Sequence, residues 1–398
     1  MDILYVSTLL SEELNSKTLN ELKFTDGQQD QKFHRLFVEG LVENGCNVET
    51  ISSLRSLKKK PKNFNFPAGK ENVGGVTYNY IKYIKNRFIR RIHTYFQTLK
   101  LIKKWKKNNK DGIILCEQRF SMLKACIHAR KLFGVKVYGI VTDLPIYHIS
   151  TITSRGLKSA YHKIYSRSRM RNTKKCDGFV LLTDQMNNVI NKKNKPYVII
   201  EGFADVKMTI YNNEQIKKYD KKVCHYAGKV IEMYGIKMLV NAFLDADIPN
   251  SELHVFGGGS YVEELAEISK KHSNIKYLGF RPNEEVVEDQ LRSHLLINPR
   301  FTNYEYTKYS FPSKIMEYMA SGTPLLTTAL AGIPNEYYEY IYVLEEETEV
   351  GLSKKLKEVL KKSSEELNDM GLKAKKFTME NKSNVFQAKK VIKMIKDN

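Results

Sequence analysis

The sequence predicts an α/β protein made of two doubly wound units, and three observations point to this fold class. The chain has 398 residues, enough for two or three domains. Short apolar runs alternate with amphipathic segments along its whole length, which is typical of βαβ units around mainly parallel sheets. The alternation stops once, at the polar stretch 205–222. We therefore expect one doubly wound unit on each side of that stretch.

The first half supplies six strand candidates and a clear amphipathic helix. We expect strands at 3–7, 48–51, 112–116, 135–141, 178–182 and 197–200. Apolar residues recur at helical spacing within 31–42, which predicts a helix there. The segment 7–30 that follows the first strand is expected to be a loop.

The second half repeats the pattern with sharper boundaries. We expect strands at 223–227, 252–256, 275–278, 295–298 and 324–327, and helices at 235–244, 261–271, 284–291, 313–321 and about 350–362. The segment 384–396 has one apolar face and must pack against another element. The expected domains are 1–205, 206–380 and a C-terminal helix at 381–398, with a return to the first domain as one option for that helix.

Charge is divided unequally between the halves. The 65 Lys and Arg against 44 Asp and Glu give a net charge of +21, but residues 1–200 carry +22 and residues 201–398 carry −1. Two segments, 82–110 and 154–175, hold most of the densely basic sequence, interleaved with aromatic and apolar residues. We expect Phe88, Ile92, Tyr95 and Leu99 to be core. The basic surface suits an anionic membrane leaflet, or alternatively nucleic acid.

Several classes of protein are disfavoured. The chain has no apolar run of about 18 residues and does not begin with a signal-peptide pattern, so neither a spanning helix nor secretion is expected. The five cysteines are scattered without a C-x-x-C pair, so we expect reduced thiols and no zinc. Gly257-Gly258-Gly259 lacks the dinucleotide spacing, and Asp245-Ala246-Asp247 reads as a helix end. No recognised nucleic-acid-binding motif accompanies the basic segments, so nucleic acid is not the expected partner.

The segment 309–324 carries the most chemistry. A loop leads to Pro312 at about the first helical position, and Gly322 caps the short helix that follows. A helix N-terminus can hold a phosphate, and Lys314 adds a cation there. Glu317, one turn further on, can accept hydrogen bonds from a ribose diol. The alternative is an ordinary βα loop in which Glu317 is simply solvated.

Six motifs, taken in their order along the chain, resemble those of a known family. The motifs are 226–229, 234–236, 255–259, 278–281, 298–300 and 311–324. Together they resemble the donor domain of GT-B glycosyltransferases of the group 1, family-4 type, in particular bacterial polysaccharide-synthesis members with an FPSK loop. The resemblance implies two Rossmann-like domains facing a cleft and a nucleotide-diphospho-sugar bound by the second. It also implies transfer with retention of configuration, without a metal or other cofactor.

The resemblance assigns residues on the donor side. Glu317 matches the glutamate that contacts the ribose, whereas Tyr309 stands where the family has a glutamate near the donor sugar. Lys229 and Tyr234 stand at the positions of the cationic pair that holds the diphosphate, so one cation is missing. Arg300, Lys314 or the helix N-terminus are candidates to replace it. The expected donor-binding residues are Gly228, Lys229, Gly258, Arg281, Arg300, Tyr309, Phe311, Pro312, Ser313, Lys314 and Glu317.

The acceptor side matches the family more loosely. The segment 140–145 resembles a His-Asp turn, with Thr142 in place of the histidine and Asp143 as the candidate catalytic group beside Glu317. Asp143 could equally be a turn residue before Pro145. His148 and Glu201 are further candidates for the acceptor or cleft side. The loop after the first strand departs from the family because Gly27 is its only glycine.

The resemblance and the charge together define the expected function. We expect a hexosyltransferase-type enzyme that moves a sugar from a nucleotide-sugar such as a UDP-sugar to a saccharide or polyprenyl-diphosphate-linked acceptor. Synthesis of capsule or exopolysaccharide at the cytoplasmic face of the membrane, with peripheral attachment, would fit the basic first half. Two alternatives are a nucleotide-sugar epimerase of the same fold and a basic nucleic-acid-binding protein.

Overall fold

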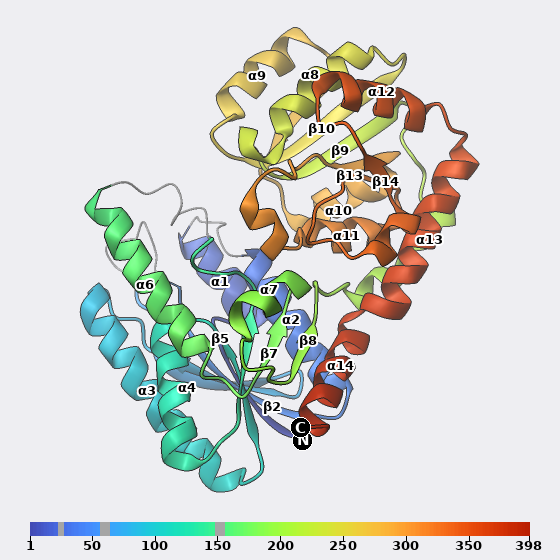
Figure 1. Ribbon diagram of the computed structural model, residues 1–398. Helices are drawn as coiled ribbons and strands as arrows, with labels where there is room; N and C mark the ends of the chain where they lie inside the picture. The colour runs from blue at the N-terminus through green and yellow to red at the C-terminus, as the bar shows by residue number, and fades with distance from the viewer. Residues whose placement is uncertain (23–27, 56–63, 148–155) are drawn as a thin grey trace. The chain divides into compact units, whose positions relative to one another are not determined.

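The chain folds into two compact units. The structure, a computed structural model, describes residues 1–22, 28–55, 64–147 and 156–398. The first unit is Met1–Phe203 together with Asn384–Asn398, and the second is Ala204–Ser383. Each unit has one central, mainly parallel sheet with helices on both faces (Figure 1). The predicted pair of doubly wound α/β domains is therefore confirmed.

The first sheet has the order β3-β4-β2-β1-β5-β6-β7-β8, and only the β3–β4 pair is antiparallel. Its strands are β1 Asp2–Ser7, β2 Asn47–Ser53, β3 Gly69–Val73, β4 Val76–Ile81, β5 Ile113–Glu117, β6 Val137–Val141, β7 Gly178–Leu181 and β8 Tyr197–Ile199. The chain winds outward in one direction from β1 and in the other from β5. The point between these two strands is where ligands bind in doubly wound sheets.

Helices cover both faces of this sheet. They are α1 Glu12–Leu22, α2 Gln28–Glu43, α3 Arg87–Asn108, α4 Phe120–Phe133, α6 Leu157–Thr173, α7 Asp184–Ile190 and α14 Asn384–Lys396. In Figure 1, α2 and α14 lie on one face, and α3, α4 and α6 lie on the other. Apolar residues of β1 and β2 pack against α2 and α14 in a single buried cluster.

Three expectations for the first unit were wrong. Residues 12–22 form helix α1 rather than a loop, while Gly27 lies outside the described residues. The β3–β4 hairpin was missed, although Gly74 and Gly75, both at positive φ, form a recognisable turn between the strands. Phe88 and Ile92 are exposed on α3 instead of buried in the core.

The C-terminal helix α14 is held in the first unit by a close approach to α2. A Cβ atom on Gly40 would lie 2.2 Å from the main-chain oxygen of Asn384. The amide of Asn44 donates hydrogen bonds to the carbonyls of Gly40 and Val385, which ties the end of α2 to α14. Only glycine at position 40 allows the two helix backbones to come this near.

The second sheet has the order β11-β10-β9-β12-β13-β14, with every recorded pair parallel. Its strands are β9 Lys222–Lys229, β10 Ser251–Gly258, β11 Ile275–Gly279, β12 Leu295–Asn298, β13 Leu325–Thr328 and β14 Tyr342–Leu344. The winding direction reverses between β9 and β12. Any side chain that follows either strand therefore stands at the ligand-binding edge of the sheet.

The helices of the second unit are α8 Ile236–Ala246, α9 Val262–Lys271, α10 Asn283–Arg292, α11 Ser313–Ser321, α12 Glu349–Leu360 and α13 Ser364–Lys382. Helices α8 and α12 share one buried cluster, and α11 and α13 contribute to a separate one. Helix α8 ends at Ala246 with Asp247 as its left-handed cap, which confirms that Asp245-Ala246-Asp247 is a helix terminus. Strand β14 and helix α13 were not predicted.

A buried carboxylate ties three elements of the second unit together. Asp289 of α10 contacts His225 Nδ1 of β9 at 2.6 Å and His254 Nδ1 of β10 at 2.7 Å. Burial opposes ionisation of Asp289, but the two histidines outweigh it and lower its pKa. Burial lowers the pKa of His225, whereas for His254 the hydrogen bond to Asp289 overcomes burial and raises it. The cluster fixes α10 beneath the strands that carry the candidate site.

Replacing Gly40 with alanine tests the close packing of α14 on α2. Alanine normally stabilises a helix interior by about 1 kcal/mol relative to glycine. Here the added methyl group collides with the backbone of Asn384, so we expect Gly40→Ala to lower the free energy of unfolding by about 2 kcal/mol in urea titration. The exposed Glu43→Ala in the same helix is the control, with an expected change within about 0.5 kcal/mol. A stabilised Gly40→Ala protein would contradict this packing.

Replacing Asp289 with asparagine tests the buried cluster through pH. The raised pKa of His254 contributes stability that is complete below its ordinary value of 6.5 and is lost as the pH rises through the raised value. We expect Asp289→Asn to cost about 3 kcal/mol near neutral pH, because it removes a buried ion-pair partner.

The difference in unfolding free energy between wild type and Asp289→Asn should shrink as the pH rises above 6.5, because wild-type His254 then loses its proton. Chemical denaturation at a series of pH values measures this difference, and other titrating groups cancel in the subtraction. A difference that does not vary with pH would rule out a charged His254 in the folded protein.

Candidate functional site

The second unit places its candidate site at the reversal point of the sheet. Gly228 and Lys229 end β9, and Pro299 and Arg300 follow β12, its neighbour. The guanidinium of Arg300 lies 4.2 Å from the ring centroid of Tyr234. The structure thus brings a cation to the residue that stands in place of the second diphosphate cation. Lys229 itself is exposed.

Glycines allow the surrounding loops to approach one another closely. Gly235 has φ +79°, and a Cβ there would lie 1.8 Å from the oxygen of Pro299. Gly257 has φ +118°, and a Cβ there would likewise lie 1.8 Å from the oxygen of Gly228. A non-glycine residue at 257 would push the paired ends of β9 and β10 apart, and one at 235 would separate the segments that follow β9 and β12.

Helix α11 begins beside this edge of the sheet. Pro312 precedes its first residue, and no side chain among the described residues caps its N-terminus. Gly322 ends it with φ +79°, as predicted. The Tyr318 hydroxyl accepts a hydrogen bond from the Ala227 amide at 2.8 Å and lies 3.3 Å from the Ala227 oxygen, so α11 is fastened to β9. Burial raises the pKa of Tyr318, which keeps the hydroxyl neutral.

The Glu317 carboxylate is held by two neighbours. Its Oε1 accepts hydrogen bonds from Lys314 Nζ at 2.7 Å and from Gln290 Nε2 at 3.0 Å. The Glu317 side chain is 10% exposed, so the solvated alternative considered from sequence is wrong. Gln290 is fully buried, and its Oε1 has no hydrogen-bond partner among the described residues. Sequence reasoning missed Gln290, because nothing in the pattern of α10 connects it with α11.

The other residues predicted for the donor side lie along the same edge or on its flanks. Ser313 is exposed, and Phe311 is buried against Tyr337 with ring centroids 5.5 Å apart. The Tyr309 hydroxyl contacts Glu305 Oε1 at 3.3 Å. A Cβ on Gly258 would meet the ring of Phe280, and the half-exposed Arg281 donates from Nε to the Leu278 oxygen. Gly258 therefore packs against Phe280, and Arg281 is held by its own loop.

Tyr306 was not predicted and joins the group around Arg300. Its hydroxyl is buried and has no hydrogen-bond partner among the described residues. Burial raises its pKa to about 12, and the charge of Arg300 acts in the opposite direction. A buried, neutral hydroxyl without a partner can serve as a ligand contact. Tyr306 lies in the aromatic-rich segment Tyr304-Glu305-Tyr306, and nothing in that sequence distinguishes it as a site residue.

In the first unit, Asp143 and Thr142 follow β6, at the edge where parallel strands end. Asp143 Oδ1 is buried without a hydrogen-bond partner in the part of the chain that the structure describes, and it lies 3.9 Å from Arg169 Nη2 of α6. Glu201 follows β8, is buried, and accepts a hydrogen bond from Gln387 Nε2 of α14 at 3.0 Å. Glu201 thus participates in packing the C-terminal helix. His148 lies outside the described residues.

A polar cluster that sequence reasoning missed occupies the reversal point of the first sheet. Glu117, the last residue of β5, accepts from Arg119 Nε at 2.8 Å and contacts His34 Nε2 at 3.3 Å. The Tyr5 hydroxyl lies 2.6 Å from His34 Nδ1. Burial opposes ionisation of Glu117, but Arg119 and His34 outweigh it and lower its pKa. The sequence feature that could have indicated this cluster is an apolar strand that ends in a glutamate, Glu117, which is buried in the structure.

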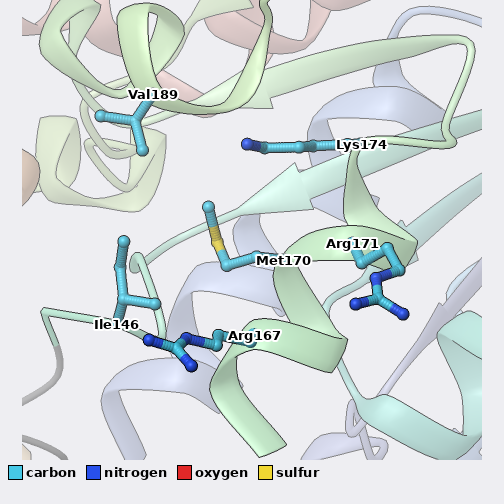
Figure 2. Close-up of a pocket in the computed structure, with 6 residues that line it drawn as sticks. All are labelled: Ile146, Arg167, Met170, Arg171, Lys174 and Val189. Atoms are coloured by element: carbon cyan, nitrogen blue, oxygen red, sulfur yellow. The ribbon is translucent and has the colours of Figure 1, made fainter. Parts of the chain in front are cut away.

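A pocket of about 420 Å³ opens in the first unit beside α6. Its lining is Ile146, Arg167, Met170, Arg171, Lys174 and Val189. Figure 2 shows Met170 between the side chains of Arg167 and Lys174, with Ile146 and Val189 opposite. The combination of apolar walls and cations suits an amphiphilic anion.

The described residues hold neither a metal-binding cluster nor a membrane-spanning helix. Residues 1–22, 28–55, 64–147 and 156–398 contain no group of three or more His, Cys, Asp or Glu side chains arranged to hold a metal ion. None of the helices in those ranges has the length and apolar character needed to cross a membrane.

Comparisons with known proteins agree with this geometry. Residues 208–377 match the family model described as glycosyl transferases group 1. No curated protein sequence matches the chain.

Among solved structures, the sucrose-phosphate synthase of Thermosynechococcus elongatus superposes with a TM-score of 0.69 at 13% identity, covering 100% of this chain and 99% of that one. The Anabaena HepE protein in complex with UDP gives 0.63 at 10% identity, covering 100% of both chains. A lipopolysaccharide outer core galactosyltransferase gives 0.60 at 14% identity, covering 100% and 99%. Residues 208–377 therefore resemble the group 1 glycosyl transferases, within a chain that has the GT-B fold.

Proposed function

We propose that the protein is a retaining glycosyltransferase that uses a nucleotide-diphospho-sugar donor, with UDP as the first nucleotide to test. The observation that carries this proposal is the buried Glu317 carboxylate, held by Lys314 and Gln290 one turn inside a helix without a side-chain cap. The UDP complex of the similarly folded Anabaena HepE supports the choice of nucleotide. The acceptor is a saccharide or a lipid-linked saccharide, in synthesis of a cell-surface polysaccharide.

The donor side can bind both halves of a nucleotide diphosphate. A carboxylate has about four lone-pair positions on its two oxygens, so the Glu317 side chain is chemically suited to accept hydrogen bonds from the ribose hydroxyls. Lys314, Arg300 and the N-terminus of α11 supply positive charge for the diphosphate. Negative charge on the leaving diphosphate grows as the glycosidic bond breaks, so fixed positive groups there lower the barrier. The reaction as proposed needs no metal.

The acceptor side is assigned to the first unit. Asp143 Oδ1, which has no hydrogen-bond partner within 1–22, 28–55, 64–147 and 156–398, is suited to an acceptor hydroxyl. Glu117 is engaged by Arg119 and His34, so it serves to order this edge of the sheet. The pocket beside α6 combines cations with apolar walls, which supports an acceptor that carries phosphate next to a hydrocarbon chain. The excess positive charge of this half supports peripheral attachment to the anionic cytoplasmic face of a membrane.

Replacing Glu317 tests the donor assignment. We expect Glu317→Ala to reduce turnover of the nucleotide-sugar by about a thousandfold, because a ribose contact and the anchor of Lys314 are both lost. The stabilisation of the protein by UDP in thermal-shift titration should fall with it. The exposed Glu365→Gln is the matched control and should behave as wild type. Unchanged UDP binding in Glu317→Ala would remove this residue from the site.

The anomeric outcome tests the retaining mechanism. With an α-linked nucleotide-sugar donor, proton NMR of the first product formed should show an α linkage, and a chelator should leave the rate unchanged. A β-linked product would show that the reaction inverts the configuration and would contradict the retaining mechanism. Loss of activity with chelator, restored by a divalent cation, would contradict the proposal that no metal takes part.

A further inference from the structure

Helix α3 turns its apolar side chains outward. Phe88, Ile89, Ile92 and Phe96 are 73, 58, 61 and 59% exposed. Positions 88, 92 and 96 follow one another at i, i+4 spacing, and Ile89 lies beside them. One ridge of the helix is therefore apolar and uncovered along its first half.

The buried face of the same half of α3 is polar. It carries Arg90, Thr94 and Thr98, and only beyond them do Ile102 and Trp105 turn inward. Arg90 Nη1 donates to the Ile84 oxygen at 3.0 Å, and Thr98 Oγ1 donates to the Thr94 oxygen at 2.7 Å. This arrangement is the reverse of that in an ordinary surface helix, which buries its apolar residues. The exposed ridge must therefore be explained by something outside this unit's core.

Helix α6 extends the apolar surface. Ile164 is 68% exposed, and its neighbour Tyr165 lies under the guanidinium of Arg91 at 5.0 Å, which places α6 beside α3. We call Phe88, Ile89, Ile92, Phe96 and Ile164 the apolar stripe. Figure 1 shows both helices, α3 in pale blue and α6 in green, on the same face of the first sheet.

Only positive charge surrounds the apolar stripe within these helices. No Asp or Glu occurs from residue 72 to residue 110 or within α6. The ridge of α3 continues from Phe96 to the exposed Lys100 and Lys103. On α6, the exposed Arg167 and Arg171 share a face with Ile164. An apolar stripe that ends in lysines and arginines matches an apolar layer bounded by phosphates.

We infer that the apolar stripe inserts into the headgroup–acyl boundary of an anionic lipid bilayer while the flanking lysines and arginines contact lipid phosphates. This inference rests on the proposed function, which places the first unit at a membrane, and it names the segment that enters the lipid. Buried apolar area and attraction to anionic lipids act together in such helices. Each basic residue near the surface and each inserted side chain strengthens binding.

The charge and the apolar side chains together favour an anionic bilayer over two other partners for the apolar stripe, namely a second copy of the chain and nucleic acid. A second copy pairing through the same stripe would oppose two surfaces of like charge, which is unfavourable. Nucleic acid would satisfy the cations but would leave Ile89, Ile92 and Ile164 in water, because phosphate contacts need no aliphatic groups.

Vesicle flotation with matched variants tests the inference. Wild-type protein should float with phosphatidylglycerol-containing vesicles and not with pure phosphatidylcholine vesicles. Phe88→Ser/Ile92→Ser should lower the partition coefficient about tenfold or more. Ile210→Ser/Val350→Ser removes two exposed apolar side chains of the second unit and should float as wild type. Equal flotation of all three proteins would overturn the inference, as would wild-type binding only to duplex DNA or only to itself.

Fluorescence reports insertion directly. Trp105 is the chain's single tryptophan and is buried, so its emission should not respond to vesicles. Phe88→Trp should add an emission band that shifts to the blue with phosphatidylglycerol vesicles. An unshifted band in protein that floats would mean that charge alone holds it and would overturn insertion.

The proposed function is checked on the same samples. UDP thermal shift and turnover with a water-soluble acceptor should be unchanged in Phe88→Ser/Ile92→Ser, because the stripe lies outside the donor site. A wild-type protein that floats but neither binds UDP nor turns over donor would refute the glycosyltransferase proposal and leave the lipid contact standing. The converse result would refute insertion and leave the enzyme assignment standing.

Discussion

The attachment of α11 to the end of β9 is the contact on which the candidate site of the second unit depends. Tyr318 reaches the main chain of Ala227 from α11, and the next strand, β12, leads into the loop before that helix. This contact sets where the N-terminus of α11 and the Glu317 carboxylate stand relative to Gly228 and Lys229. Gln290 adds a second support from α10, whose own position is fixed by Asp289 and the two histidines. The site is thus held from beneath by buried polar contacts rather than by its own exposed loops.

The two units differ in net charge and therefore in how each can attract an anionic ligand. The second half of the chain is nearly neutral, so any attraction for a nucleotide diphosphate there must come from local groups, namely Lys314, Arg300 and the helix N-terminus. The first half carries the whole positive excess, and α3 and α6 contain none of its few acidic residues. A surface of that kind attracts anionic partners over about a Debye length.

The fold could be predicted from sequence wherever local pattern and burial agree. Strand β12 and helix α11 were predicted at their observed ends, because Pro312 and Gly322 limit the helix chemically. The β3–β4 hairpin was missed because the edge strand β3, Gly-Lys-Glu-Asn-Val, is polar and mostly exposed and lacks the apolar run that indicated the other strands. The misjudged face of α3 has a physical cause. Apolar periodicity identifies a helix face but cannot say whether protein or lipid covers it, and here the core side carries Arg90 and two threonines.

The candidate site likewise contains residues that could be predicted from the sequence and residues that could not. Residues within one continuous segment, such as Lys314 and Glu317, could be predicted because helical spacing alone brings them together. Gln290, Tyr306 and the Glu117–His34 pair could not, since their neighbours are distant in sequence and meet only through the fold. Asp143 was found through its strand-end position, but the arginine beside it, Arg169, comes from a helix that the sequence marked only as basic.

A crystal structure of the protein with UDP tests the donor assignment directly. We expect ribose hydroxyls within hydrogen-bonding distance of the Glu317 carboxylate and a diphosphate between the N-terminus of α11 and Arg300, with Lys314 close to it. Nucleotide density at another edge of either sheet, with no ribose hydroxyl near Glu317, would contradict the donor assignment.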